Sequence, residues 1–142
     1  MNANSVYVVN SNRVGGEALA NKGAEKVTVR YLIGEREGSS RFALRLYTVE
    51  EGGHTPLDQH AYEHHVYVLH GRGVMRTDDN GATLREINEA DSIFIPSNAV
   101  HQFINEQREP LVFLCVKGNP SIYTQSSPKE EQSLDQDEQN SC

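Results

Sequence analysis

Residues 58–71 read DQHAYEHHVYVLHG and contain four of the six histidines of the chain. Asp58 and three of these histidines, His60, His64 and His70, occupy even positions. Because alternate residues of a β-strand point to the same face, we expect Asp58, His60 and His64 to share one face. His65 has the opposite parity and is expected outside, and His70 ends the strand at its rim. Imidazoles gathered on one face indicate a metal site rather than a chance run of surface histidines.

Strand signals continue on both sides of this stretch. Short segments rich in Val, Ile, Leu, Phe, Tyr and Thr recur between breaks that carry Gly, Asn, Asp or Pro. They are KVTVRYLI (26–33), RFALRLYTV (41–49), HVYVLHG (65–71), GVMRTDD (73–79), ATLREI (82–87), DSIFIP (91–96), HQFIN (101–105) and PLVFLCVKG (110–118). Asn80-Gly81 predicts a hairpin, and HGRG (70–73) a second tight reversal. The pattern predicts an all-β sandwich or barrel.

The chain has 142 residues, which suits one domain with one core. We expect an N-terminal strand and loop in 1–26, the barrel in 27–120 and a disordered tail in 121–142. Residues 126–142 have one leucine as their only large apolar residue, too little buried surface to offset the ordering entropy. Cys115 and Cys142 are not expected to form a disulfide framework or a zinc motif, which indicates a reduced, cytoplasmic protein.

Charge and hydropathy exclude two classes of partner. The net charge of −7 disfavours nucleic acid, because phosphates would be repelled. No apolar run approaches the roughly 20 residues that cross a bilayer, and no signal peptide is visible at the N-terminus. We therefore expect a small-molecule substrate as the partner.

A distant histidine completes the candidate metal site. His101 opens the strand HQFIN, and with Asp58, His60 and His64 it makes three imidazoles and one carboxylate. Imidazole suits Fe, Cu, Ni and Zn, and a carboxylate adds affinity for Mn²⁺ and Fe²⁺. The set predicts one divalent metal ion per chain, with Mn or Fe favoured and Zn, Ni or Cu possible.

Two stretches resemble the conserved motifs of the cupins. GGHTPLDQHAYEHHVYVLHGRG (52–73) is similar to the first motif, and ADSIFIPSNAVHQFIN (90–105) to the second, with Asp91, Pro96, His101 and Asn105 matching. The resemblance runs from Val27 to Gly118 and is closest to small single-domain cupins that carry histidine where others have glutamate. It implies a double-stranded β-helix, or jelly-roll, barrel that commonly forms homodimers.

Three positions depart from the family pattern. Asp58 stands where the first histidine is usual, and it can ligate directly, bridge through water or orient a neighbouring imidazole. Asn98 replaces a glycine, and asparagine tolerates positive φ. Ala90 also replaces a glycine, which suggests that its turn needs no left-handed residue.

Further residues are candidates for a substrate pocket. Phe103 shares the parity of His101, and Cys115 looks into the cavity if its face of the strand is inward. Arg45 can hold a substrate carboxylate with two hydrogen bonds. The alternatives are ordinary packing for Phe103 and Cys115 and a surface position for Arg45. The strand at 110–116 is apolar on both faces, so a homodimer or the N-terminal segment VYVVN (6–10) should cover its outer face.

The leading functional hypothesis is a small metal-dependent cupin oxygenase, most simply a dioxygenase acting on a small oxygenated organic molecule. A metal-dependent isomerase, cyclase or decarboxylase is the alternative within the same fold. A non-catalytic small-molecule-binding cupin and a structural protein with incidental histidines are the other two. No catalytic residue is assigned from the sequence.

Overall fold

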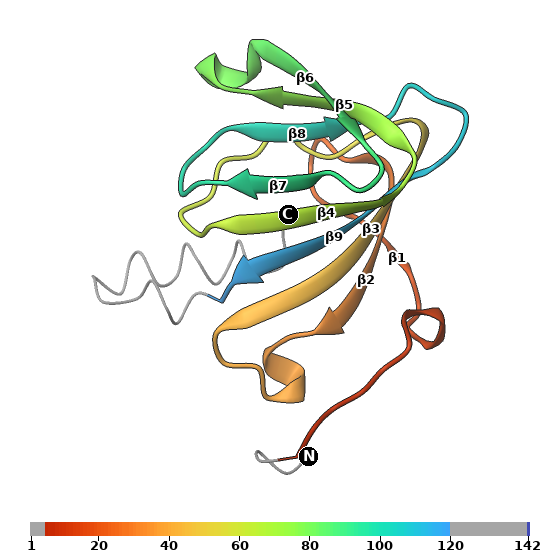
Figure 1. The fold of residues 1–142 in the computed structure, drawn as a ribbon, viewed down its shortest axis with the longest axis vertical. Helices are drawn as coiled ribbons and strands as arrows, with labels where there is room; N and C mark the ends of the chain where they lie inside the picture. Colours follow the sequence, from red (N-terminus) through yellow and green to blue (C-terminus); the bar gives the residue numbers. More distant parts are fainter. Residues whose placement is uncertain (1–4, 120–141) are drawn as a thin grey trace.

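The computed structural model describes residues 5–119 and Cys142, and this part of the chain contains strands and short 3-10 helices but no α-helix (Figure 1). The strands are β1 (Glu17–Ala18), β2 (Glu25–Ile33), β3 (Phe42–His54), β4 (His64–His70), β5 (Arg72–Thr77), β6 (Thr83–Asn88), β7 (Ser92–Ile95), β8 (His101–Ile104) and β9 (Leu111–Gly118). The 3-10 helices are η1 (Ser11–Arg13), η2 (Glu35–Glu37) and η3 (Asp79–Gly81). The all-β prediction is confirmed, whereas the predicted tail lies outside the described residues except for Cys142.

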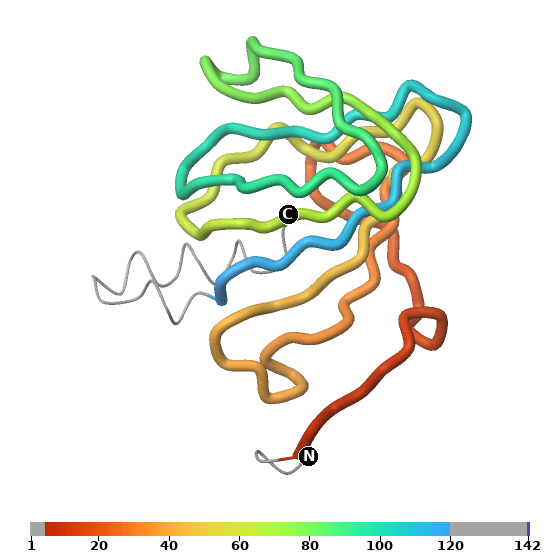
Figure 2. Tube along the Cα trace, viewed as in Figure 1, coloured from red at the N-terminus to blue at the C-terminus, as the bar shows by residue number. Residues whose placement is uncertain are grey.

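The strands form one antiparallel sheet that curls into a half-barrel, as the chain trace shows (Figure 2). The hydrogen-bonded order is β6-β5-β8-β3-β9-β4-β7, and β2 extends the sheet from β3 and carries β1. The long strand β3 joins the two parts of the sheet. It pairs with β9 from Phe42 to Val49 and meets β8 at His54, which lies opposite Ile104. This is the jelly-roll arrangement expected from the sequence.

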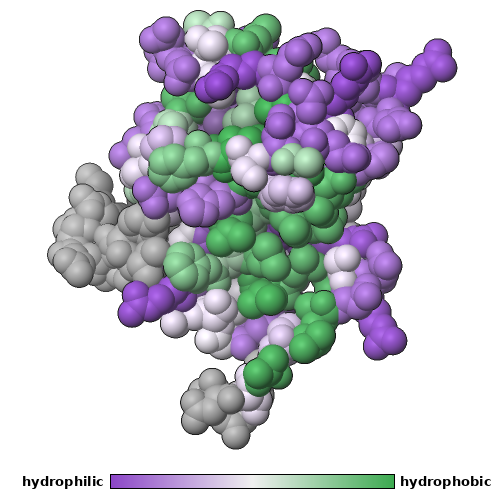
Figure 3. Space-filling model, viewed as in Figure 1, coloured by the Kyte–Doolittle hydropathy of each residue, from purple (hydrophilic) through white to green (hydrophobic). Residues whose placement is uncertain are grey.

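Alternation along the strands places the core inside the curl. In β3, Ala43, Arg45, Tyr47 and Val49 are buried, and the residues between them are half-buried. The Phe113 ring stacks on two other aromatic rings, with centroids 5.3 Å from Tyr47 and 4.3 Å from Phe103. On the face drawn in Figure 3, hydrophobic residues gather across the middle of the molecule and hydrophilic residues surround them.

The turns agree with the sequence at two positions and differ at two others. Asn80 (φ 60°) and Gly81 (φ 88°) connect β5 to β6 as predicted, and Asn98 has the expected positive φ of 65°. Ala90 was expected to avoid the left-handed region, but its φ is 74°. Its turn is held in place because the Ala90 N–H donates to Val68 O at 2.9 Å and the Asp91 carboxylate accepts from the Asn88 N–H at 2.7 Å.

The predicted reversal at HGRG is a corner and not a hairpin. β4 pairs with β7 and β9, whereas β5 pairs with β6 and β8, so the chain passes from one part of the sheet to the other. Gly71 makes this corner at φ 81°, and a Cβ there would overlap the carbonyl oxygen of Pro110. Only glycine fits this close approach without strain.

The N-terminal segment differs from the prediction. Residues 6–10 form no strand, and Val6 and Val8 are 91% and 86% exposed, so they do not cover the outer face of β9. The strand of this region is instead β1, which occupies the edge of β2 by pairing Glu17 with Val29 and Ala18 with Thr28. None of the helices within 5–119 is both long and apolar enough for a bilayer crossing.

Candidate metal centre

Three histidines from separate parts of the chain meet inside the curled sheet. His64 is the first residue of β4, His101 is the first residue of β8, and His60 lies in the irregular segment before β4. Their exposed fractions are 4% for His60 and 1% for each of the other two. The ring centroids lie 5.1 to 5.4 Å apart, and one nitrogen of each ring lies within 4.8 Å of the others. The three rings predicted as ligands are therefore brought together.

Backbone hydrogen bonds hold the irregular segment against β8. The Asp58 N–H donates to His101 O at 2.9 Å, and the His101 N–H donates to Asp58 O at 3.0 Å. The Asn98 N–H donates to His60 O at 2.6 Å. Asp58 and His60 were expected on a strand, but Asp58 forms an isolated bridge and β4 begins only at His64. The bridge between Asp58 and His101, as well as strand parity, therefore brings the three histidines together.

The other histidines of the quoted stretch lie outside the cluster, as predicted. His65 points outward from β4, and its ring contacts Phe94 edge-on with centroids 5.6 Å apart. The half-exposed His70 side chain lies 3.6 Å from the Glu89 carboxylate and 3.3 Å from the Glu109 carboxylate. A rim histidine between two acids has no access to the interior.

Burial keeps the imidazoles of His64 and His101 neutral. The pKa of His64 is lowered to about 2, first by burial and then by the neighbouring His101 and His60 and the charges of Lys117 and Arg45. Burial also lowers the pKa of His101, against the opposing effect of the carbonyl of Ala99. A neutral imidazole retains the lone pair that a metal ion needs.

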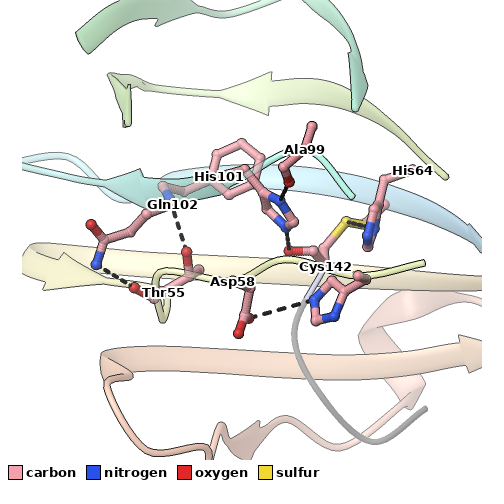
Figure 4. Close-up of polar contacts among 10 residues, drawn as sticks. Thr55, Asp58, His64, Ala99, His101, Gln102 and Cys142 are labelled. Carbon is pink, nitrogen blue, oxygen red and sulfur yellow. Dashed lines mark hydrogen bonds and ion pairs between the residues drawn. A yellow bond between two sulfur atoms is a disulfide. The ribbon is translucent and has the colours of Figure 1, made fainter. Parts of the chain in front are cut away.

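A carbonyl oxygen lies beside each ring nitrogen of His101. Nδ1 lies 2.9 Å from the carbonyl oxygen of Ala99, and Nε2 lies 2.7 Å from that of Cys142 (Figure 4). A neutral ring has one N–H, so only one of these contacts can be a hydrogen bond. Placing the hydrogen on Nδ1 matches the usual orientation of a metal-ligating histidine, whose other nitrogen donates to a carbonyl. Nε2 would then present its lone pair to the cluster.

These residues fit a metal ion. Three buried imidazoles converge, and Nε2 of His64 is buried without a hydrogen-bond partner among residues 5–119 and Cys142. Asp58 lies at the edge of the cluster, with its Oδ2 atom 3.6 Å from Nε2 of His60 and its side chain 19% exposed. The group of donor atoms within 4.8 Å of one another contains the three histidines and not Asp58.

Cys142 corrects two sequence predictions. Its sulfur is bonded to Cys115, with the two Cα atoms 6.1 Å apart, so the cysteines are not reduced in this structure. Cys142 is also buried, although it belongs to the segment predicted to be disordered. Its Sγ lies 3.2 Å from Nδ1 of His64, and Figure 4 shows it between His64 and His101. Because Cys142 is 27 positions from Cys115, no local sequence pattern predicts that the two cysteines pair.

Comparison with known proteins identifies the family. The Cupin domain model matches residues 45–117, which is just over half of the chain and includes all three clustered histidines. The chain belongs to the cupin family.

Two solved structures and one curated protein are similar to this cupin. The polyketide cyclase RemF from Streptomyces resistomycificus is 31% identical, with a TM-score of 0.75 over 92% of this chain and 99% of that one. A cupin-2 domain from Rhodospirillum rubrum is 29% identical, with a TM-score of 0.65 over 80% and 74%. The 1-methylthio-D-xylulose 5-phosphate methylsulfurylase of Rhodospirillum rubrum is 36% identical over 73 residues. The match covers 51% of this cupin but only 45% of the methylsulfurylase.

The predicted pocket residues of the cupin are all buried. Phe103 stacks on Phe113, and Cys115 faces the interior as expected if its strand face were inward. Arg45 is not on the surface: it is 4% exposed and borders a hollow of about 810 Å³ together with Tyr31 and Ala43.

Sequence reasoning missed Lys117 and Tyr62. Both are fully buried, and the Lys117 Nζ atom lies 4.4 Å from the centroid of the Tyr62 ring. The Tyr62 ring stacks on His60 with centroids 4.8 Å apart. The signal for Lys117 was its parity with Cys115 in an otherwise apolar strand.

His101 borders a second hollow, of about 560 Å³, on the side of β5 and β7.

Proposed function

We propose that this cupin is a metal-dependent enzyme that acts on a small oxygenated organic substrate in the manner of a cyclase. One divalent ion would be held by His60, His64 and His101, with Asp58 as a direct or water-bridged fourth ligand. The observation that carries the proposal is the convergence of three buried imidazoles. The cyclase class is supported by 31% identity to a polyketide cyclase over nearly the whole of both chains.

When bound, the ion would supply a Lewis acid that draws electron density from a substrate carbonyl or enolate oxygen. The chain itself supplies orientation and a water-poor interior. With its hydrogen on Nδ1, His101 would donate to Ala99 O, which fixes that ring. The stacked rings of Tyr47, Phe113 and Phe103 are fully buried and keep the interior of the sheet apolar.

The fourth ligand sets the choice of metal. A carboxylate beside three imidazoles favours Mn²⁺ or Fe²⁺, whereas three imidazoles alone also suit Zn²⁺, Ni²⁺ and Cu²⁺. Asp58 is close to His60 but more exposed than the histidines, which suits an exchangeable position. Because three imidazoles and a carboxylate also suit Fe²⁺, a dioxygenase is the second candidate function.

Metal titration tests the centre. Metal-free protein, with its disulfide reduced, is titrated with Mn²⁺, Fe²⁺ and Zn²⁺ by calorimetry, and we expect one ion per chain. His101→Ala should abolish uptake, whereas His65→Ala removes an outward imidazole of the same stretch and should bind like the wild-type protein. Equal losses in the two variants, or no uptake by the wild-type protein, would contradict the proposal.

A β-diketone separates the reaction classes. 2,4-Pentanedione is incubated in D₂O with the metal-loaded protein, and both deuterium entry at C3 and dissolved oxygen are followed. A cyclase that forms enolates should accelerate deuterium entry over free metal without consuming oxygen. Oxygen consumption by the iron-loaded protein would support the dioxygenase instead. Binding of the diketone without either change would indicate a non-catalytic cupin.

We also propose that the protein forms a homodimer through the outer face of β3 and β9. Apolar side chains on this face are only half-buried within one chain: Leu44, Leu46, Val112, Leu114 and Val116. Half-buried apolar area of this kind is typical of a covered interface. Sedimentation equilibrium should give twice the chain mass, and Leu114→Lys should shift it toward the monomer.

A further inference from the structure

The disulfide between Cys115 and Cys142 lies against the histidine cluster. Cys115 belongs to β9, where it pairs with Val66 of β4, two residues from His64. The two cysteines are buried, with exposed fractions of 0% for Cys115 and 1% for Cys142. They are the only cysteines of the chain. Both sulfur atoms are therefore brought to the edge of the candidate metal centre.

His64 contacts the sulfur atoms with one nitrogen and leaves the other for an ion. Its Nδ1 atom lies 3.2 Å from Sγ of Cys142 and 3.5 Å from Sγ of Cys115. Nε2 of the same ring is buried and has no hydrogen-bond partner among residues 5–119 and Cys142. His64 also belongs to two groups of donor atoms within 4.8 Å of one another, one with His60 and His101 and one with the two cysteines. This imidazole thus connects the sulfur pair with the histidine cluster.

The carbonyl group of Cys142 occupies the place of an ion beside His101. Its oxygen lies 2.7 Å from Nε2 of His101 (Figure 4). The contact has the geometry of a hydrogen bond, so the oxygen lies close to the direction in which this nitrogen would bind an ion. An ion on Nε2 would lie about 2.1 Å from it, in space that the oxygen fills. The ion and this carbonyl therefore exclude each other.

The bond between the sulfur atoms keeps the carbonyl in this place. The contacts of Cys142 with His64 and His101 are single hydrogen bonds, which contribute little net free energy because water can replace them. A covalent bond is not displaced in this way, so an ion must compete with the disulfide in the oxidised protein. After reduction Cys115 stays in β9, whereas the bond that ties Cys142 to it is gone. An ion can then displace the carbonyl from His101.

We propose that Cys115 and Cys142 form a redox-active pair whose disulfide excludes a divalent ion from the histidine cluster and whose dithiol form admits it. The oxidant would be a small disulfide such as oxidised glutathione. The Cys142 thiolate attacks one sulfur of the small disulfide and releases one thiol; the Cys115 thiolate then attacks Cys142 and releases the second. Both protein sulfurs are oxidised, and the two released thiols take up the protons that the protein thiols lose. This inference rests on the proposed function, because it controls access to the same metal centre.

Mutual exclusion acts in both directions. If the disulfide lowers the affinity for the ion by some factor, a bound ion must oppose formation of the disulfide by the same factor. A disulfide that only stabilises the fold behaves differently. Its reduction would lower the melting temperature and leave the affinity for the ion unchanged.

The test uses Mn²⁺, because thiols are soft ligands and bind this hard ion weakly. Oxidised and reduced wild-type protein are titrated with Mn²⁺ by calorimetry, and alkylation with mass spectrometry verifies the state of the thiols. The reduced protein should bind at least about fivefold more tightly, the effect of one competing hydrogen bond. In glutathione buffers, saturating Mn²⁺ should lower the ratio of squared reduced glutathione to oxidised glutathione at half-oxidation by the same factor.

Cys142→Ser is the matched control, because it removes the disulfide and keeps a side chain of similar size. It should bind Mn²⁺ as tightly as the reduced wild-type protein in oxidising and in reducing buffer, and a redox effect that persists in this variant overturns the inference. Equal affinities of the oxidised and reduced wild-type protein also overturn it and leave the metal function intact, as does failure of the disulfide to form in excess oxidised glutathione. If neither the reduced wild-type protein nor Cys142→Ser binds Mn²⁺ or Zn²⁺, the proposed function fails and this inference fails with it.

Discussion

The buried imidazole of His64 predicts a specific loss of stability in acid. Burial lowers its pKa to about 2 in the folded protein, whereas an unfolded histidine titrates near 6.5. As the pH falls below about 6.5, the unfolded chain gains a proton that the folded chain does not accept. The free energy of unfolding must therefore fall with decreasing pH, and no such loss occurs above this range.

The size of the effect follows from the two pKa values. Between pH 7.5 and pH 5.0, protonation of one unfolded histidine lowers the free energy of unfolding by about 2 kcal/mol. His64 is 1% exposed, so solvent screening reduces this little. The lowered pKa of His101 adds a loss of the same sign.

Urea denaturation of the metal-free protein at the two pH values measures this loss. His64→Gln should show a loss about 2 kcal/mol smaller than that of the wild-type protein, whatever its own stability at pH 7.5. His65→Gln removes an exposed imidazole and should retain the full loss. The reasoning is refuted if His64→Gln and the wild-type protein lose the same free energy between pH 7.5 and pH 5.0.

Three further predictions concern single residues. Asp58→Ala should weaken Mn²⁺ binding roughly tenfold and His60→Ala more strongly; calorimetry that gives equal losses would make Asp58 a full ligand. Cys142→Ser should raise the affinity for Zn²⁺ several-fold, because without the bond to Cys115 the carbonyl oxygen of Cys142 is no longer held 2.7 Å from Nε2 of His101; unchanged affinity would show that this carbonyl does not compete with the ion. Gly71→Ala should lower the free energy of unfolding by at least about 2 kcal/mol, because its Cβ would overlap Pro110 at positive φ; a melting temperature equal to that of the wild-type protein would contradict this.

Periodicity and composition were sufficient for the fold class and for the strand positions. Alternation places successive side chains on opposite faces, so the burial of His64 and the exposure of His65 follow from parity, whereas Cys115 was expected inside only if its face of the strand was inward. The convergence of His101 with His60 was predicted by resemblance, because strand parity does not tell which strands pair. Asn98 has the positive φ that was expected from its residue type.

The missed features depend on contacts between distant residues. Ala90 adopts a left-handed backbone because hydrogen bonds to Val68 and around Asp91 hold its turn. The position of Cys142 depends on a partner 27 residues away. Lysine is usually exposed, so the burial of Lys117 is not expected from its residue type. Its place beside His64 depends on the pairing of β9 with β4. Local sequence carries little of this information.

The bridge between Asp58 and His101 has a consequence for how metal affinity can be measured. The backbone already joins the two ligand-bearing segments in the folded protein. The conformational entropy of fixing them, about 1–2 kcal/mol per residue, is therefore lost on folding and not on metal binding. An ion that finds such a preorganised chelate has little chain left to order. The rise in melting temperature on adding an ion would then depend on its concentration and dissociation constant alone. Thermal shifts would rank Mn²⁺, Fe²⁺ and Zn²⁺ on one affinity scale.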